Sequence, residues 1–349
     1  MAAESDSFEH DRKRFSKSTS LNENAENEAL AIGAVKILEK YSGSSTVMCC
    51  SVFPSNNQVA IGWADGTVEI RDGESFEVQN TLAGPSNLPV TSLSENETDD
   101  SGMHLLASYA SGDTILWDAV ESNKTWYEKE DRQTLVNSFN LDCSSFALSG
   151  SDAKISIYDR YTGTLSSVLQ GSIDPDVMDG HTMRVFALRY HPTNKNELLS
   201  GGWDDTVQFW DVRDPIAIRK IYGPHICGNG IEFLGDNKVV TASWRKQDPL
   251  QVWDYGSGKL IQNINPDELT SFLYFCRYVE SEAYFLVGGS HKNILRIIDV
   301  NTRTTLGSVR NLKGAVYFAR ELPKSSPLLY VANICFGSDN DVYVIQVET

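Results

Sequence analysis

The sequence lacks the short motifs that mark most enzymes and metal proteins. It contains no G-x-x-x-x-G-K-[ST] loop for phosphates, no G-x-G-x-x-G between a strand and a helix, no H-E-x-x-H and no EF-hand loop. It has only six cysteines, none of them in a C-x-x-C pair or with a histidine at zinc spacing. We therefore predict no catalytic residue, no metal and no cofactor, and free thiols in a reducing compartment.

Basic residues and long apolar runs are scarce as well. The 30 Lys and Arg residues face 47 Asp and Glu residues, a net charge of −17, which disfavours binding to nucleic acid or an anionic membrane. No apolar run reaches the ~18 residues of a membrane span, and the N-terminus lacks the pattern of a signal peptide. We expect an intracellular protein, in the cytoplasm or the nucleus. Its acidity fits plain solubility or a partner rich in Lys and Arg.

What is present is a globular composition behind a polar N-terminal stretch. Apolar residues make up 41% of the chain and aromatic residues 10%, enough for a sizeable core. Residues 1–28 are rich in Ser, Asn, Asp and Glu and contain a short basic island, which predicts a disordered tail. The domain prediction is a tail over 1–28 and one folded domain over 29–349.

One pattern recurs along this folded domain. A Ser- or Gly-rich step and a polar turn residue precede an alternating apolar strand, which usually ends in an aromatic or aliphatic residue followed by Asp. Seven copies end about 46 residues apart. The copies are residues 62–72, 110–118, 149–159, 200–211, 249–254, 294–299 and 341–346. Each unit holds about four short strand-like runs, typical of a small antiparallel sheet that must stack on its neighbours, and radial stacking around a channel satisfies every unit.

Two dipeptides of the fourth copy, Gly180-His181 and Trp210-Asp211, resemble the signature of a WD40 repeat, with Trp117-Asp118 and Trp253-Asp254 in register. The resemblance covers about residues 30–349. It implies an all-β, seven-bladed β-propeller with four-stranded antiparallel blades, in which an N-terminal strand completes the last blade. We assign that closing strand to residues 31–39, and expect that removing residues 1–28 is tolerated whereas removing 1–40 abolishes folding.

The resemblance also implies a hydrogen-bonded tetrad within a blade, whose members in the fourth copy are His181, Ser200, Asp204 and Trp210. These residue types match a catalytic triad, but no strained nucleophile turn accompanies them, so we interpret the tetrad as structural. The fifth copy predicts a partial tetrad from His225, Ser243 and Trp253.

Large side chains recur at the turn between the second and third strands, where the family mostly has Ser or Gly. Aromatic and Arg anchors surrounded by polar groups are typical of protein interfaces, and the alternative is that the rings extend the core over the next blade. The predicted partner-binding rim consists of Trp63, Tyr109, Arg184, Trp203, Asp205, Trp244, Arg245 and His291.

Taken together, the resemblance implies a non-catalytic scaffold or adaptor, a monomer within a larger complex, that binds peptide or protein partners on the propeller rim. Two alternatives stay open. The segment from Trp210 and Asp211 to Arg213 resembles the W-D-x-R box with which some WD-repeat proteins dock onto the adaptor of cullin-4 ubiquitin ligases as substrate receptors. A reader of basic, histone-like tails would instead require an acidic mouth of the central channel.

Overall fold

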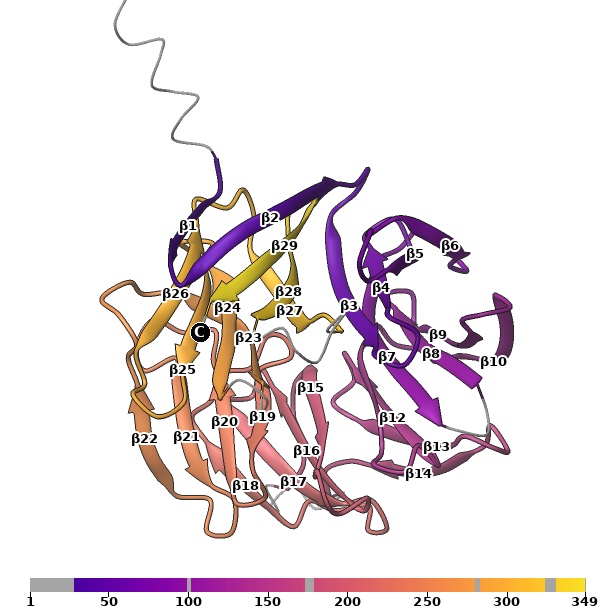
Figure 1. The fold of residues 1–349 in the computed structure, drawn as a ribbon. Helices are drawn as coiled ribbons and strands as arrows, with labels where there is room; N and C mark the ends of the chain where they lie inside the picture. Colours follow the sequence, from indigo (N-terminus) through magenta and orange to yellow (C-terminus); the bar gives the residue numbers. More distant parts are fainter. Residues whose placement is uncertain (1–27, 99–101, 173–178, 280–282, 324–330, 349) are drawn as a thin grey trace, which may run out of the picture.

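The computed structural model describes residues 28–98, 102–172, 179–279, 283–323 and 331–348. The predicted tail, apart from residue 28, lies outside the described residues. Within them every regular element is a β-strand, and nothing helical is long and apolar enough to cross a membrane. The strands form seven sheets arranged around a central channel (Figure 1). The predicted all-β, seven-bladed β-propeller is therefore confirmed.

The blades follow one another along the chain, and each runs from the channel outward. The strands of blades 1 to 4 are β3 (Val47–Phe53), β4 (Gln58–Trp63), β5 (Thr67–Asp72) and β6 (Val78–Ala83); β7 (Val90–Thr98), β8 (Gly102–Tyr109), β9 (Asp113–Asp118) and β10 (Asn123–Lys129); β11 (Thr134–Phe139), β12 (Ser145–Gly150), β13 (Ile155–Asp159) and β14 (Leu165–Leu169); β15 (Val185–Tyr190), β16 (Glu197–Gly202), β17 (Thr206–Asp211) and β18 (Arg219–Tyr222).

The strands of blades 5 to 7 are β19 (Ile231–Leu234), β20 (Lys238–Ala242), β21 (Leu250–Asp254) and β22 (Leu260–Ile264); β23 (Phe272–Val279), β24 (Tyr284–Ser290), β25 (Leu295–Asp299) and β26 (Thr305–Arg310); β27 (Val316–Glu321), β28 (Val331–Ser338), β29 (Asp341–Glu348) and β2 (Val35–Ser42). The innermost strand of each blade contacts that of the next, and β27 contacts β3, so the ring is closed.

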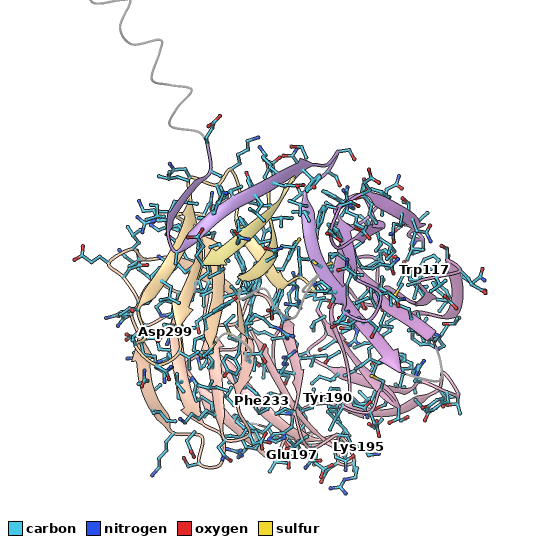
Figure 2. The ribbon with its side chains drawn as sticks, in the orientation of Figure 1. Trp117, Tyr190, Lys195, Glu197, Phe233 and Asp299 are labelled. Atoms are coloured by element: carbon cyan, nitrogen blue, oxygen red, sulfur yellow. The ribbon has the colours of Figure 1, made fainter. Side chains whose placement is uncertain are left out.

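Burial explains why the third strands carried the clearest sequence signal. Five successive residues of β17 are buried because a neighbouring blade covers each face of the sheet, whereas most residues of the outermost strand β6 are exposed. Side chains fill the spaces between adjacent blades (Figure 2). The aspartate that ends six of the third strands caps the following turn: Asp254 Oδ1, for example, accepts the backbone N–H of Ser257 at 2.7 Å.

Ring closure differs in detail from the prediction of one strand over residues 31–39. Strand β2 does complete blade 7, with Val35 opposite Val347 and Ser42 opposite Asp341. The preceding residues form a separate strand, β1 (Leu30–Gly33), which pairs with β26 and gives blade 6 a fifth strand (Figure 1). The division falls at Gly33, whose φ of +77° ends the first strand where the chain crosses to the next blade.

Candidate functional site

The ring has two faces that differ in their loops. On one face, which we call the turn face, the second strand of each blade turns into the third and the innermost strand begins; in blade 4, Val185 at the start of β15 lies opposite Gly202 at the end of β16. The other face carries the loops between first and second strands and between third and fourth strands. We call it the opposite face.

The structure brings the four predicted tetrad residues together inside blade 4. His181 Nδ1 lies 2.8 Å from Asp204 Oδ2 and its Nε2 lies 2.6 Å from Ser200 Oγ, and Trp210 Nε1–H donates to the same hydroxyl at 2.7 Å. Burial by itself raises the pKa of Asp204, but hydrogen bonds from His181 and the backbone of Thr182 outweigh it and hold that pKa below its ordinary value. Ser200 is fully buried, so no substrate can reach its hydroxyl, and the network links strands of one blade.

The partial tetrad predicted for blade 5 is wrong. Trp253 Nε1–H donates to Thr241 Oγ1 at 2.9 Å and not to Ser243, which lies two residues further along the chain. His225 Nδ1 instead lies 2.6 Å from Asp205 Oδ1 of blade 4. Side chains of a strand alternate with a period of two, so Thr241 and Ser243 point to the same face of the sheet. The sequence pattern could not distinguish these two hydroxyl groups and selected the wrong one.

Two residues of the predicted rim are core residues. Trp63 is 3% exposed and its ring lies over Gly43, where a Cβ atom would come within 2.3 Å of it. Tyr109 is 0% exposed and packs in the core between blades 1 and 2. Both rings extend the core over a neighbouring segment, which is the alternative that the sequence left open, so neither belongs to the candidate site.

The other aromatic side chains of the predicted rim belong to a continuous row across the turn face of blades 4, 5 and 6. We call this row the aromatic arc; it consists of Phe186, Trp203, His225, Trp244, Phe272 and His291. Successive ring centroids lie 5.3, 6.4, 6.3, 4.9 and 5.6 Å apart. The two indoles at its centre are 36% and 39% exposed. Sequence reasoning missed the two phenylalanines and the role of His225, because these residues lie on first strands and on a loop rather than at the turn.

Polar side chains hold the arc in place. The guanidinium of Arg184 lies 5.5 Å from the centre of the Trp203 ring. Nε1–H of Trp203 donates a hydrogen bond to Cys227 Sγ, with 3.0 Å between nitrogen and sulfur. Burial raises the pKa of the Cys227 thiol to about 11, so the sulfur accepts this hydrogen bond as a neutral group. Arg245 donates to the carbonyl oxygens of Gly223 and Asp248 at 2.8 and 2.9 Å. It therefore supports the lengthened turn beneath Trp244.

The arc continues into the mouth of the central channel. A cavity of about 210 Å³ opens there, and Phe186 belongs both to its lining and to the arc. On the far side of this mouth, the rings of Tyr274 and Tyr317 lie 5.0 Å apart. Arg320 lines this cavity, and none of its described lining residues carries a carboxylate. An acidic mouth, which a reader of basic tails would require, is thus not found at this end.

The W-D-x-R box lies on the opposite face. The side chain of Arg213 is 71% exposed, and its guanidinium makes a two-point contact with Asp211 at 2.8 and 2.5 Å. Trp210 of the same box is buried in the tetrad. Elsewhere among the described residues, no group of three or more His, Cys, Asp and Glu side chains is arranged to hold a metal ion.

Comparisons with known proteins agree with this architecture. A family model described as WD domain, G-beta repeat matches residues 175–211, the segment that ends with β17. The Ribosome biogenesis protein WDR12 homolog of Oryza sativa subsp. japonica is 25% identical over 249 residues, which cover 62% of this chain and 51% of that protein. Coronin-7 of Mus musculus is 33% identical over 83 residues, covering 24% of this chain and 9% of that protein.

A third relative, the Small ribosomal subunit protein RACK1 of Drosophila melanogaster, is 26% identical over 98 residues, covering 28% of this chain and 30% of that protein. The chain spans about half or less of the length of these curated relatives. The matched repeat and the buried tetrad within it support the WD40 family, and the closed ring of seven blades is a seven-bladed β-propeller.

Proposed function

We propose that this protein is a non-catalytic scaffold or adaptor that binds a protein or peptide partner across the aromatic arc. The observation that supports the proposal is the arc itself: six rings in sequence on three adjacent blades, with two indoles more than one-third exposed. Clustered aromatic side chains beside an Arg are the usual composition of an interface hot spot.

The surroundings of the arc favour docking over simple packing. Met183 is 48% exposed on the loop before β15 and adds an apolar side chain next to Arg184.

The size of the expected contribution follows from the exposed area. About one-third of an indole of ~250 Å² corresponds to ~90 Å², and covering it contributes about 2 kcal/mol at ~25 cal/mol per Å². Each of Trp203 and Trp244 should therefore strengthen binding by roughly thirtyfold.

The proposal is tested by affinity purification with partners identified by mass spectrometry. We compare the wild-type chain with the double variant Trp203→Ala, Trp244→Ala and with Met183→Glu, which keeps both indoles. The matched control is Ile218→Glu, a 62% exposed residue at the outer edge of the same blade. We expect the first two variants to lose the same partners and the control to retain them.

The melting temperature of each variant separates binding from packing. The double variant should melt lower than the wild type, because each indole is more than half buried, whereas Met183→Glu should melt within a few degrees of it. If Met183→Glu retains every partner, the loss of partners in the double variant is explained by damaged packing. The docking proposal would then fail.

The ubiquitin-ligase alternative makes a different prediction. A substrate receptor would co-purify with the ligase adaptor through Arg213, whose exposure on the opposite face leaves it accessible. Arg213→Ala should then remove that adaptor and leave the partners of the arc unchanged. The two functions are compatible, because their residues lie on different faces of the ring.

A further inference from the structure

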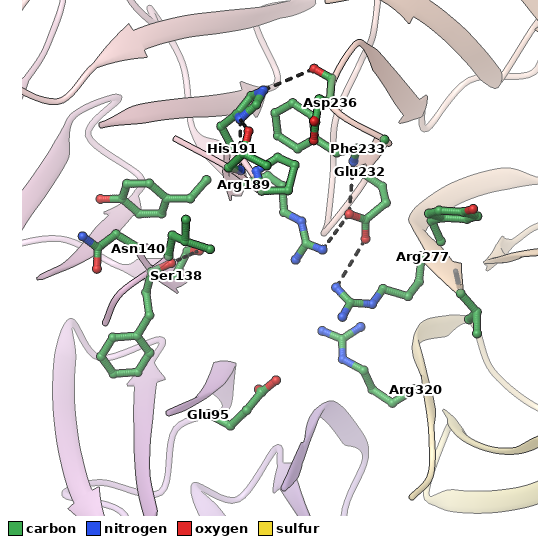
Figure 3. A pocket seen from close by; sticks show the side chains of 18 of the residues that line it. Glu95, Ser138, Asn140, Arg189, His191, Glu232, Phe233, Asp236, Arg277 and Arg320 are labelled. Atoms are coloured by element: carbon green, nitrogen blue, oxygen red, sulfur yellow. Dashed lines mark hydrogen bonds and ion pairs between the residues drawn. The ribbon is translucent and has the colours of Figure 1, made fainter. Parts of the chain in front are cut away.

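On the opposite face the central channel widens into a cavity of about 790 Å³ (Figure 3). Its walls are the innermost strands of several blades and the loops that follow them. Pockets of ~300 to 1,000 Å³ are typical of small-molecule sites. The scaffold function proposed above makes no use of this cavity.

Three arginines from three different blades project into this cavity (Figure 3): Arg189 from β15, Arg277 from β23 and Arg320 from β27. Two of them share one carboxylate, since Glu232 Oε1 lies 2.6 Å from Arg189 Nη2 and its Oε2 lies 3.3 Å from Arg277 Nη1. The Glu232 side chain is 5% exposed, and its Oε1 also accepts the backbone N–H of Phe233 at 3.1 Å.

Arg320 has no such carboxylate. Among the described residues its one hydrogen bond runs from Nη1 to the carbonyl oxygen of Ala319 at 3.3 Å, and no carboxylate lies within ion-pair distance. Glu95 lies across the cavity and accepts a hydrogen bond from the hydroxyl of Ser51 (Figure 3). Burial, and then the neighbouring charge of Arg277, lower the pKa of Arg320 to about 10, so the guanidinium stays charged at neutral pH.

Arg320 is partly exposed and lines the channel, so its unused donors face the cavity and are open to an anion. An arginine presents five N–H donors in a planar fork that matches the oxygens of a phosphate or carboxylate. Three guanidinium groups converge on this cavity, whose lining also contains four carboxylates: Glu95, Glu232, Asp236 and Glu321. These acidic residues would disfavour a long polyanion and leave room only for a compact one.

We propose that this cavity binds a small oxyanion, a compact compound whose phosphate or carboxylate group is held by Arg320 together with Arg277 and Arg189. The hydroxyl group of Ser138 lies in the same wall and would face the rest of the ligand. The cavity opens at the other end of the channel from the aromatic arc, and Arg320 lines the channel at both ends. Binding of the oxyanion does not depend on the proposed docking function.

The test uses the full-length chain with pyrophosphate, inorganic phosphate and malonate as probes. Isothermal titration calorimetry and thermal melting compare each probe with sodium chloride at the same ionic strength, which removes general salt effects. We expect at least one probe to bind the wild type and raise its melting temperature. The phosphate and malonate arms distinguish a phosphate from a carboxylate ligand.

Arg320→Met is the decisive variant and Arg213→Met, an exposed arginine on the same face, is its control. Because Arg320 has no carboxylate partner, the ligand-free Arg320→Met protein should melt at or above the temperature of the wild type. It should bind the probe at least ~10-fold more weakly, since a charge-assisted contact is lost. Arg320→Lys keeps the charge but loses the fork, and we expect intermediate binding.

Three results would each overturn the proposal. The first is that no probe binds the wild type more strongly than chloride does. The second is that Arg320→Met and Arg320→Lys bind the probe as well as the wild type and Arg213→Met do. The third is a large loss of stability in ligand-free Arg320→Met, because that result would assign the guanidinium a purely structural role.

Discussion

The free energy with which residues 30–42 stabilise the closed ring follows from the number of cross-strand residue pairs that they form. Strand β2 pairs with β29 through seven residue pairs, and β1 pairs with β26 through four. At a net contribution of about 1 kcal/mol for each backbone hydrogen bond, β2 stabilises the ring by ~7 kcal/mol and β1 by ~4 kcal/mol. The first value is comparable with the entire stability of a typical domain, about 5 to 15 kcal/mol.

Removing β2 also exposes groups that the ring keeps buried. Asp341 is 0% exposed and accepts a hydrogen bond from Ser42 Oγ at 2.6 Å and an ion pair from Lys40 at 3.0 Å. Without β2, the whole of β29 becomes an unpaired edge, which favours aggregation. The two strands should therefore differ sharply in their effect on folding.

The assay compares three N-terminal truncations by circular dichroism, thermal melting and size-exclusion chromatography. We expect removal of residues 1–27 to leave the melting temperature within a few degrees of the full chain. Removal of residues 1–34 deletes β1 and should lower it by roughly 10 °C, at about 2 to 4 °C for each kcal/mol. Removal of residues 1–42 deletes β2 as well and should abolish cooperative melting. A soluble product of this last truncation that melts like the first would refute the assignment of β2 as the closing strand.

Two further predictions concern single residues. Gly33→Ala should lower the free energy of unfolding by more than ~1 kcal/mol, because the residue has a φ of +77° and a Cβ atom would lie 2.4 Å from the carbonyl oxygen of Leu306; an unchanged denaturant midpoint would contradict this. Because the pKa of Asp204 is lowered in the folded protein, its carboxylate stabilises the fold above pH ~4, the unfolded value, and this contribution is lost as the pH falls through the lowered value. Asp204→Asn should melt lower than the wild type at pH 7, with a difference that shrinks in acid, and a constant difference would exclude this linkage.

The contrast between Trp63 and Trp203 reflects a difference of one residue in position. Trp63 is the last residue of β4 and lies opposite Val47, the place that Gly202 holds opposite Val185 in blade 4, so Trp203 stands one residue further along the turn. Trp63 is buried and its ring lies over Gly43, whereas Trp203 stacks on Phe186 and keeps a face in solvent. Because side chains alternate along a strand, an offset of one residue turns the side chain to the other face, and the sequence pattern placed both indoles at the same turn without resolving that offset.

The sequence alone determined the number of blades, their strand order and the tetrad of blade 4. These features are local: an Asp caps the turn after each third strand in six blades, and that strand alternates apolar with other residues because neighbouring blades cover it, so each copy carries its own signal. The switch of blades at Gly33 was not predicted, since its strain arises only where the chain crosses from β26 to β29.

The tertiary structure alone decided the composition of the aromatic arc and of the arginine-lined cavity. Arg189, Arg277 and Arg320 are separated by dozens of residues and lie on three first strands, where nothing in the local pattern distinguishes them from other surface arginines. They converge because closing the ring turns the first strand of every blade toward one channel. Local patterning specifies the blades, and the closure of the ring brings the side chains from different blades together.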